Sequence, residues 1–272
     1  MSHVPTGTIL DKILDQTATD VAARKARMPV AALYAKGEGR PAPVSLHGVL
    51  SAPGMSVIAE IKRASPSRGV FPVEIDPAVV AADYIAGGAA AISVLTDEPF
   101  FQGSLDDMAQ AAQVAHGADR PVAILRKDFL IDPYQVVEAW AYGADAVLLI
   151  VAALTDDQLR ELMTVVDEYG LEALVEVHDE TEMARAIVLG ARVLGINNRD
   201  LHTFAMDLST TERLAPLAPI DAVVIGESGV FGPAEIERLW KAGAQAVLVG
   251  EGVIVQPDRA DAVRVLRESV AV

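Results

Sequence analysis

A regular alternation of apolar and amphipathic segments governs the sequence from Val57 onward. Apolar runs rich in Val, Ile, Leu and Ala occur at 57–61, 91–95, 122–125, 146–150, 173–177, 193–196, 222–225 and 246–249. Segments of helical period follow them at 78–85, 105–115, 134–141, 156–168, 180–189, 210–217, 234–241 and 258–268. Short apolar runs of this kind predict strands covered on both faces, and their alternation with helices is typical of parallel βα units.

A weak internal repeat supports a closed arrangement of these units. The dipeptide Gly-Ala lies between a predicted helix and the next strand at 88–89, 143–144, 190–191 and 243–244. Glycine favours the left-handed conformation in which many helices end. The four dipeptides therefore predict the same helix-to-strand junction at four places. Eight βα units over about 215 residues predict a (β/α)8 TIM barrel. A doubly wound open sheet is the alternative, but no G-x-G-x-x-G follows the first strand.

The residues before the first strand form a different kind of segment. Residues 8–27 have helical periodicity and basic residues near their end. Residues 36–43 are rich in Gly, Pro and charge and predict a linker, and residues 45–50 predict a short helical turn. We therefore expect one barrel domain over 1–272, in which 1–52 is an N-terminal helical extension.

Composition restricts the partners and the location of the protein. The net charge of −16 argues against nucleic acid and anionic membranes, although a small anionic substrate is compatible with local cationic groups. The longest apolar run, 146–154, is too short to span a bilayer. The chain contains no cysteine, so it has no disulfide or thiolate metal site, which fits the cytoplasm.

Charged and amide side chains stand at the predicted carboxyl ends of the strands. Glu60 and Lys62 are two residues apart and therefore share one face of the first strand. Any one such residue is more simply explained as a structural ion pair or a cap. Together, however, they would converge on the end of the barrel where TIM-barrel enzymes carry out catalysis. The candidates are Glu60, Lys62, Lys127, Glu176, Asn197 and Glu227.

Glycines after the last two strands predict a phosphate site. Loops at this position of a barrel, followed by a short helix, offer free backbone N–H groups to a phosphate. Tight turns without a ligand are the alternative. The candidate residues are Ser65, Ser228, Gly229, Gly250 and Glu251. His178 is followed by several acidic residues, but the spacing matches no standard metal motif, so we predict only that it precedes a helix and expect no metal.

Six segments resemble the indole-3-glycerol phosphate synthase family of tryptophan biosynthesis. They are 59–67 (AEIKRASPS), 101–105 (FQGSL), 125–129 (LRKDF), 174–178 (LVEVH), 195–201 (GINNRDL) and 226–230 (GESGV). The resemblance implies a (β/α)8 barrel with extra N-terminal helices and no cofactor. It also implies the conversion of 1-(2-carboxyphenylamino)-1-deoxyribulose 5-phosphate to indole-3-glycerol phosphate, carbon dioxide and water. Other enzymes of the pathway are implied as potential partners.

The same resemblance implies roles for the residues at the strand ends. Lys127 is similar to the general acid of ring closure, Lys62 to the lysine that holds the substrate carboxylate, and Glu176 to the general base of dehydration. Glu60, Asn197 and Glu227 would orient these groups and the substrate hydroxyls.

The remaining site residues would bind the two ends of the substrate, according to the resemblance. Phe129 would line the anthranilate pocket, and Arg199 would help to anchor the substrate. The phosphate would be held by Ser65, Ser228, Gly229, Gly250 and Glu251. Glu251 departs from the serine that some relatives have there, which leaves the backbone N–H groups as the main donors.

Two other functions are compatible with parts of the pattern. One is a different barrel enzyme with a phosphorylated substrate, such as a sugar-phosphate isomerase. The related phosphoribosylanthranilate isomerase usually carries a catalytic cysteine, which this chain lacks. The other is a non-catalytic module that binds a phosphate ligand, but binding alone does not require both an acid and a base.

Overall fold

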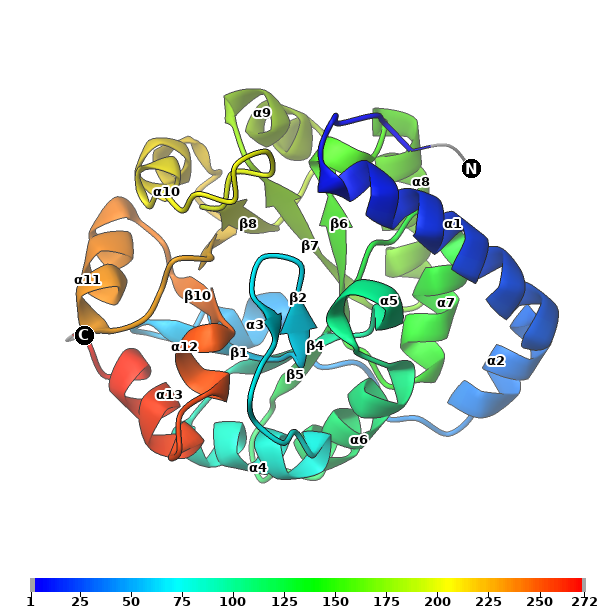
Figure 1. Ribbon diagram of the computed structural model, residues 1–272, viewed down its shortest axis with the longest axis horizontal. Helices are drawn as coiled ribbons and strands as arrows, with labels where there is room; N and C mark the ends of the chain where they lie inside the picture. Colours follow the sequence, from blue (N-terminus) through cyan, green and yellow to red (C-terminus); the bar gives the residue numbers. More distant parts are fainter. Residues whose placement is uncertain (1–2, 271–272) are drawn as a thin grey trace.

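The computed structural model describes residues 3–270 and contains a closed barrel of eight parallel strands (Figure 1). Each strand is hydrogen-bonded to two neighbours in the order β1-β10-β9-β8-β7-β6-β5-β4, which returns to β1. The predicted TIM barrel is therefore confirmed, and the open sheet is excluded. The strands are β1 (Ser56–Ile61), β4 (Ala91–Leu95), β5 (Ala123–Lys127), β6 (Ala146–Ile150), β7 (Glu172–Val177), β8 (Val193–Asn197), β9 (Val223–Glu227) and β10 (Ala246–Val249).

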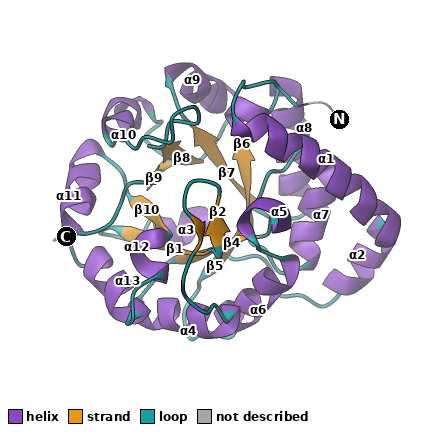
Figure 2. Ribbon diagram, in the orientation of Figure 1, coloured by secondary structure: helices purple, strands orange, loops and turns teal. Residues whose placement is uncertain are grey.

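Helices surround the barrel, as Figure 2 shows. They follow the strands in sequence as the alternating pattern predicts, and the Gly-Ala junctions have left-handed glycines as expected. The helices that follow β1 are α4 (Pro77–Gly87), α5 (Glu98–Phe101), α6 (Leu105–His116), α7 (Pro133–Ala141), α8 (Asp156–Glu168), α9 (Glu180–Val188), α10 (Ser209–Leu214), α11 (Pro233–Ala242), α12 (Glu251–Ile254) and α13 (Arg259–Arg267). The predicted helix at 210–217 is interrupted, because its end forms the 3-10 turn η2 (Ala215–Leu217), which contains Pro216.

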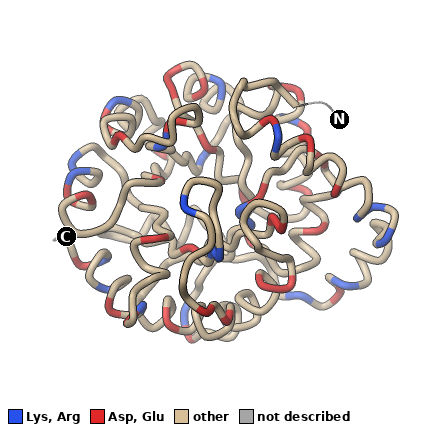
Figure 3. The backbone as a smooth tube through the Cα atoms, viewed as in Figure 1, with Lys and Arg blue, Asp and Glu red and all other residues tan. Residues whose placement is uncertain are grey.

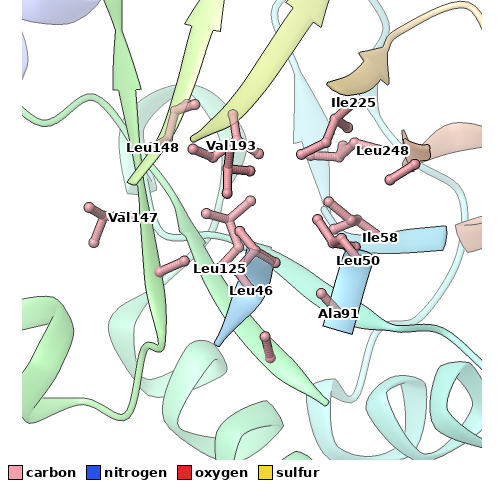
Figure 4. Close-up of a cluster of buried hydrophobic side chains, with 14 of the residues drawn as sticks. Leu46, Leu50, Ile58, Ala91, Leu125, Val147, Leu148, Val193, Ile225 and Leu248 are labelled. Carbon is pink, nitrogen blue, oxygen red and sulfur yellow. The ribbon is translucent and has the colours of Figure 1, made fainter. Parts of the chain in front are cut away.

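The interior of the barrel is filled with aliphatic side chains. Ile58, Leu125 and Ile225 are fully buried in the same cluster (Figure 4). The amino-terminal end of the barrel is closed by α3 (Leu46–Leu50), whose Leu46 and Leu50 are buried in this cluster. This packing leaves the carboxyl ends of the strands as the open end.

The N-terminal segment contains one helix that the sequence did not predict. The helix α1 (Ile9–Arg27) agrees with the prediction, but α2 (Val30–Gly37) includes residues 36 and 37, which lie in the predicted linker. Of the aliphatic side chains in α2, Leu33 is the buried one. A single buried position gives the sequence no apolar repeat of helical period, so the helix could not be predicted. Gly37 packs so closely on the ring of Trp140 that no Cβ would fit.

The loop after β1 contains a second unpredicted element. Its residues form a short antiparallel hairpin of β2 (Ala64–Ser65) and β3 (Gly69–Val70), which projects over the open end of the barrel in Figure 1. Two-residue strands carry too little alternation to be read from a sequence. No helix in the described part of the chain is long and apolar enough to cross a membrane.

Candidate active site

A pocket opens at the carboxyl ends of the strands, and every predicted site residue lines it. These residues are Glu60, Lys62, Ser65, Lys127, Phe129, Glu176, Asn197, Arg199, Glu227, Ser228, Gly229, Gly250 and Glu251. Figure 3 shows that backbone positions of both basic and acidic residues lie inside the ring of helices. The N-terminal helix also contributes to the pocket through Ile9, Leu10 and Ile13, so the wall includes residues that precede the barrel.

Lys127 is at the centre of the charged cluster. It is the last residue of β5, and its Nζ lies 3.1 Å from Glu176 Oε2 and 3.0 Å from Glu227 Oε2. The two glutamates are buried, with residue exposures of 3% and 2%. The single ammonium group of Lys127 balances part of the negative charge that Glu176 of β7 and Glu227 of β9 bring together.

The charges of this cluster shift the pKa values of its members in different directions. Burial alone would lower the pKa of Lys127, but Glu176, Glu227 and Glu60 outweigh burial and raise it. Burial would raise the pKa of Glu176, but the charge of Lys127, with help from His178, lowers it to about 2. The pKa of Glu227 is raised to about 7 by burial and by the charge of Glu176. The cluster therefore contains one strongly ionised carboxylate and one that titrates near neutral pH.

A second ion pair lies at the end of β1, where Nζ of Lys62, the residue after the strand, is 2.6 Å from Glu60 Oε1. The alternation of side chains along the strand places both on the pocket side, as predicted. Gly250, at the end of the neighbouring β10, leaves the space that this pair fills. A Cβ atom at Gly250 would lie 2.5 Å from Glu60 Oε1 and 2.8 Å from Lys62 Nζ.

Asn197, the last residue of β8, connects the charged cluster to the loops. Its Nδ2 donates a hydrogen bond of 3.2 Å to Glu176 Oε1. Its Oδ1 accepts a hydrogen bond of 3.0 Å from the hydroxyl of Ser228 and one of 3.1 Å from the backbone N–H of Arg199. The accepting bonds fix the amide orientation, and Asn197 thereby holds one oxygen of Glu176 in place.

The loops after β9 and β10 have the backbone geometry of an anion site. Ser228 and Gly229 both have positive φ, of 63° and 83°, a conformation that points successive N–H groups to one side. The short helix α12 begins at Glu251. The carboxylate of Glu251 forms an ion pair with Arg68 of the hairpin, at 2.9 Å from Oε1 to Nη2.

An apolar wall closes the opposite part of the pocket. The rings of Phe101 and Phe129 lie with their centroids 5.9 Å apart. Both side chains line the pocket together with the aliphatic residues of α1. The two tilted rings offer the aromatic ring of a ligand an apolar surface in the same pocket as the ammonium groups.

Three features of the site were not predicted from the sequence. Arg68 pairs with Glu251 although the two are far apart in the chain. Gly195 of β8 is required because a Cβ there would overlap Glu227 Oε1. His178 precedes α9, as predicted, but its Nε2 also lies 3.4 Å from Glu176 Oε1. The spacing of two between Glu176 and His178 could have indicated that they share a face.

The site can donate a proton, accept one and bind an anion within one pocket. The ammonium groups of Lys127 and Lys62 can donate a proton, and the carboxylates of Glu176 and Glu227 can accept one. The backbone N–H groups of Ser228 and Gly229, which line the same pocket, can bind an anion. Within residues 3–270, no group of three or more His, Cys, Asp or Glu side chains has the geometry of a metal site.

Comparison with known proteins identifies close relatives along nearly the whole chain. The family model described as "Indole-3-glycerol phosphate synthase" matches residues 10–266. The protein of that name from Roseiflexus sp. (strain RS-1) is 46% identical over 263 residues, which cover 95% of this chain and 98% of the relative. The protein of the same name from Parafrankia sp. (strain EAN1pec) is 51% identical over 249 residues, which cover 92% and 91%.

Two solved structures are similar to this chain in fold alone. 3-Hexulose-6-phosphate synthase matches with a TM-score of 0.61 and 18% identity, over 80% of this chain and 100% of that chain. Thiamine phosphate pyrophosphorylase from Pyrococcus furiosus matches with a TM-score of 0.60 and 16% identity, over 83% and 97%. Both agree with the barrel seen here.

Proposed function

We propose, from the premise that this chain belongs to the indole-3-glycerol phosphate synthase family, how its strand-end residues carry out the reaction. The protein is an indole-3-glycerol phosphate synthase, a carboxy-lyase of tryptophan biosynthesis. Its proposed substrate is 1-(2-carboxyphenylamino)-1-deoxyribulose 5-phosphate. The observation that carries the assignment of roles is the position of Lys127 Nζ between Glu176 and Glu227, at the wall of the pocket.

Lys127 acts as the general acid of ring closure. The aromatic ring attacks the ketone carbon, so negative charge develops on the ketone oxygen and requires a proton. Lys127 carries that proton, because the carboxylates beside it raise its pKa. Lys62 pairs with the substrate carboxylate, and the iminium formed by ring closure accepts the electron pair when carbon dioxide leaves.

Glu176 acts as the base of dehydration. In the free enzyme its low pKa makes it a weak base, and the main cause of this low pKa is Lys127. Once Lys127 has given its proton to the substrate, that cation is gone and the basicity of Glu176 rises. Glu176 then removes a proton from the ring-closed intermediate, and an ammonium group protonates the hydroxyl that leaves as water. Glu60, Asn197 and Glu227 orient these groups.

The ends of the substrate bind on opposite sides of these residues. The phosphate lies at the N–H groups of Ser228, Gly229, Gly250 and Glu251, with Ser65 and Arg199 beside it. Phe129 packs on the anthranilate ring. These positions are supported by the positive φ at Ser228 and Gly229 and by the ring contact of Phe129 with Phe101.

The proposal includes the domain organisation of the chain. Residues 1–52 would be an extension of a single barrel domain over 1–272, which is supported by the residues of α1 in the pocket.

The proposal also includes the location and the partners of the protein. We propose a cytoplasmic location, since a chain without cysteine needs no oxidising compartment. Association with other enzymes of tryptophan biosynthesis would be tested by gel filtration of the mixed proteins.

Fluorescence of the indole product tests the reaction and the role of Lys127. The purified protein should convert the ribulose phosphate in the presence of EDTA, and Lys127→Met should lose turnover by at least about a hundredfold. Lys241→Met, on the exposed surface of α11, is the matched control and should keep full activity. Full turnover by Lys127→Met would refute the role of this lysine, whereas an inactive wild-type protein would refute the reaction.

A further inference from the structure

His178 forms a bridge between two carboxylates behind the wall of the pocket. Its Nδ1 lies 3.0 Å from Glu182 Oε2, and its Nε2 lies 3.4 Å from Glu176 Oε1. The side chain is 14% exposed and is not part of the pocket lining. His178 therefore contacts the proposed base from the side that faces away from the substrate.

Glu182 fixes the imidazole from the first turn of α9. The same Oε2 accepts a hydrogen bond of 2.8 Å from the backbone N–H of His178. Both the main chain and the ring of His178 are thus bound to one carboxylate oxygen. This leaves the ring little freedom to turn, and its Nε2 stays within 3.4 Å of Glu176 Oε1.

Each oxygen of Glu176 has its own partners as a result. Oε2 faces Lys127, while Oε1 lies between the amide of Asn197 and the ring of His178. A carboxylate held by donors at both oxygens cannot rotate without losing a partner. The position of its free lone pairs, which must reach the substrate, is thereby determined.

We propose that His178 is a positioning residue for Glu176, which rests on the proposed role of Glu176 as the base of dehydration. The doubly protonated imidazolium is the form that attracts both carboxylates, because it donates a hydrogen bond to Glu182 and forms an ion pair with Glu176. A neutral ring has one N–H, so it leaves one of the two carboxylates facing a nitrogen lone pair. Loss of the ring proton therefore weakens the hold on Glu176.

The surrounding charges favour this protonated form. The charged groups around the ring are Glu182 on α9, Glu176 on β7 and Glu227 on β9, with Lys127 on the far side of Glu176. Burial alone would lower the pKa of His178, but the hydrogen bond that its ring donates to Glu182 and the charges of these glutamates raise the pKa above its usual value. Within residues 3–270, Nε2 makes no hydrogen bond, and its contact with Glu176 Oε1 is an ion pair at 3.4 Å.

Substitutions at His178 test the proposal through the kinetics. His178→Leu should lower kcat between about tenfold and a hundredfold, because a displaced base loses its alignment. KM should stay within about twofold, since the ring does not contact the substrate. His178→Gln keeps an N–H donor and should recover part of kcat. A kcat of His178→Leu equal to that of the wild type would overturn the proposal.

Glu182→Gln offers a second test that keeps the hydrogen-bond acceptor and removes only the charge. The pKa of His178 should fall, so the loss of kcat at alkaline pH should begin about one pH unit lower. Glu180→Gln is the matched control on the same helical turn, because Glu180 pairs with Arg213 at the surface. Identical pH profiles for the two variants would overturn the proposal.

Titration of the histidine ring by NMR separates this inference from the proposed reaction. The His178 signal is identified by its loss in His178→Gln. Its pKa should fall in Glu176→Gln and in Glu182→Gln but not in Glu180→Gln. An unchanged pKa in Glu176→Gln would overturn the bridge even in an active enzyme. If the variants show these pKa shifts but the wild-type protein forms no product, the reaction is refuted and the bridge is not.

Discussion

Gly250 leaves the space in which the Glu60 carboxylate lies, because a Cβ atom at this position would be 2.5 Å from Glu60 Oε1. Gly250→Ala should therefore displace the ion pair of Glu60 and Lys62. We expect kcat/KM to fall by about a hundredfold, since a small displacement of reacting groups is enough for this loss. The overpacking should lower the free energy of unfolding by about 1–3 kcal/mol. Steady-state kinetics and urea unfolding measure the two effects.

Gly232→Ala provides the control for this substitution. Gly232 lies at the start of α11. A Cβ atom added there would have a side-chain oxygen of Glu235 as its nearest neighbour, at 3.8 Å. Activity and stability should change little. If Gly250→Ala keeps its activity and stability as Gly232→Ala does, the close approach of Gly250 to Glu60 is not required for catalysis or folding.

The fold could be predicted largely from the alternation of segments, because buried strands and amphipathic helices produce different residue periods. The charged residues of the site could be found because each one interrupts an apolar strand at its end. Their partners could not be found in the same way. The contact of Arg68 with Glu251 joins residues of two different loops, and no local pattern encodes it. The role of Gly195 also depends on β9, which supplies the side chain of Glu227.

The pKa of Glu227 predicts a dependence of stability on pH. Its folded pKa of about 7 lies above the unfolded value of 4.5. The contribution of Glu227 to the free energy of unfolding is fully present below about pH 4.5 and is lost as the pH rises through 7. The total loss is about 3 kcal/mol, since each pKa unit corresponds to about 1.4 kcal/mol. Glu227→Gln should remove this decline. Urea unfolding between pH 5 and 8 measures it.

Glu161→Gln, an exposed position on α8, is the control for that experiment. It should keep the decline in stability of the wild type. Glu176 has the opposite sign, because its folded pKa of about 2 lies below the unfolded value of 4.5. Its contribution is present above about pH 4.5 and is lost at acid pH. A free energy of unfolding that rises from pH 5 to 8 in the wild type and not in Glu227→Gln would contradict the prediction.

Arg126 stabilises the barrel from the position next to Lys127. Its guanidinium is fully buried and pairs with Asp128 and Glu138, at 2.9 Å in each case. Arg126→Met leaves the buried Asp128 without its cation and Glu138 with Arg24 alone, so it should lower the free energy of unfolding by about 3–5 kcal/mol. At low temperature the folded fraction should bind substrate with nearly the wild-type KM, because Arg126 does not line the pocket.

Arg160→Met is the matched control for Arg126→Met. Arg160 pairs with Asp157 at the surface of α8, where both side chains are largely exposed. Such a pair contributes at most about 1 kcal/mol, so little stability should be lost. Equal unfolding midpoints for the two methionine variants would show that the buried network of Arg126 does not stabilise the fold.

The ion pair of Arg68 and Glu251 predicts a competition at the phosphate end of the pocket. Glu251 begins α12, so its carboxylate lies where the proposed phosphate would meet N–H groups, and it holds the cation that an anionic substrate would attract. Glu251→Gln removes this competitor. We expect KM to fall by about two- to fivefold with kcat unchanged, because an exposed pair contributes less than about 1 kcal/mol. Steady-state kinetics at low salt measure the change.

Arg68→Gln should have the opposite effect on the same constant. Without the guanidinium, KM should rise, and its dependence on ionic strength should weaken because one screened attraction is lost. The double variant separates competition from simple repulsion. If Glu251 acts by holding Arg68, Glu251→Gln should lower KM much less in a chain that already carries Arg68→Gln. If both backgrounds show the same fall, the carboxylate acts on the phosphate directly, and the ion pair has no part in binding.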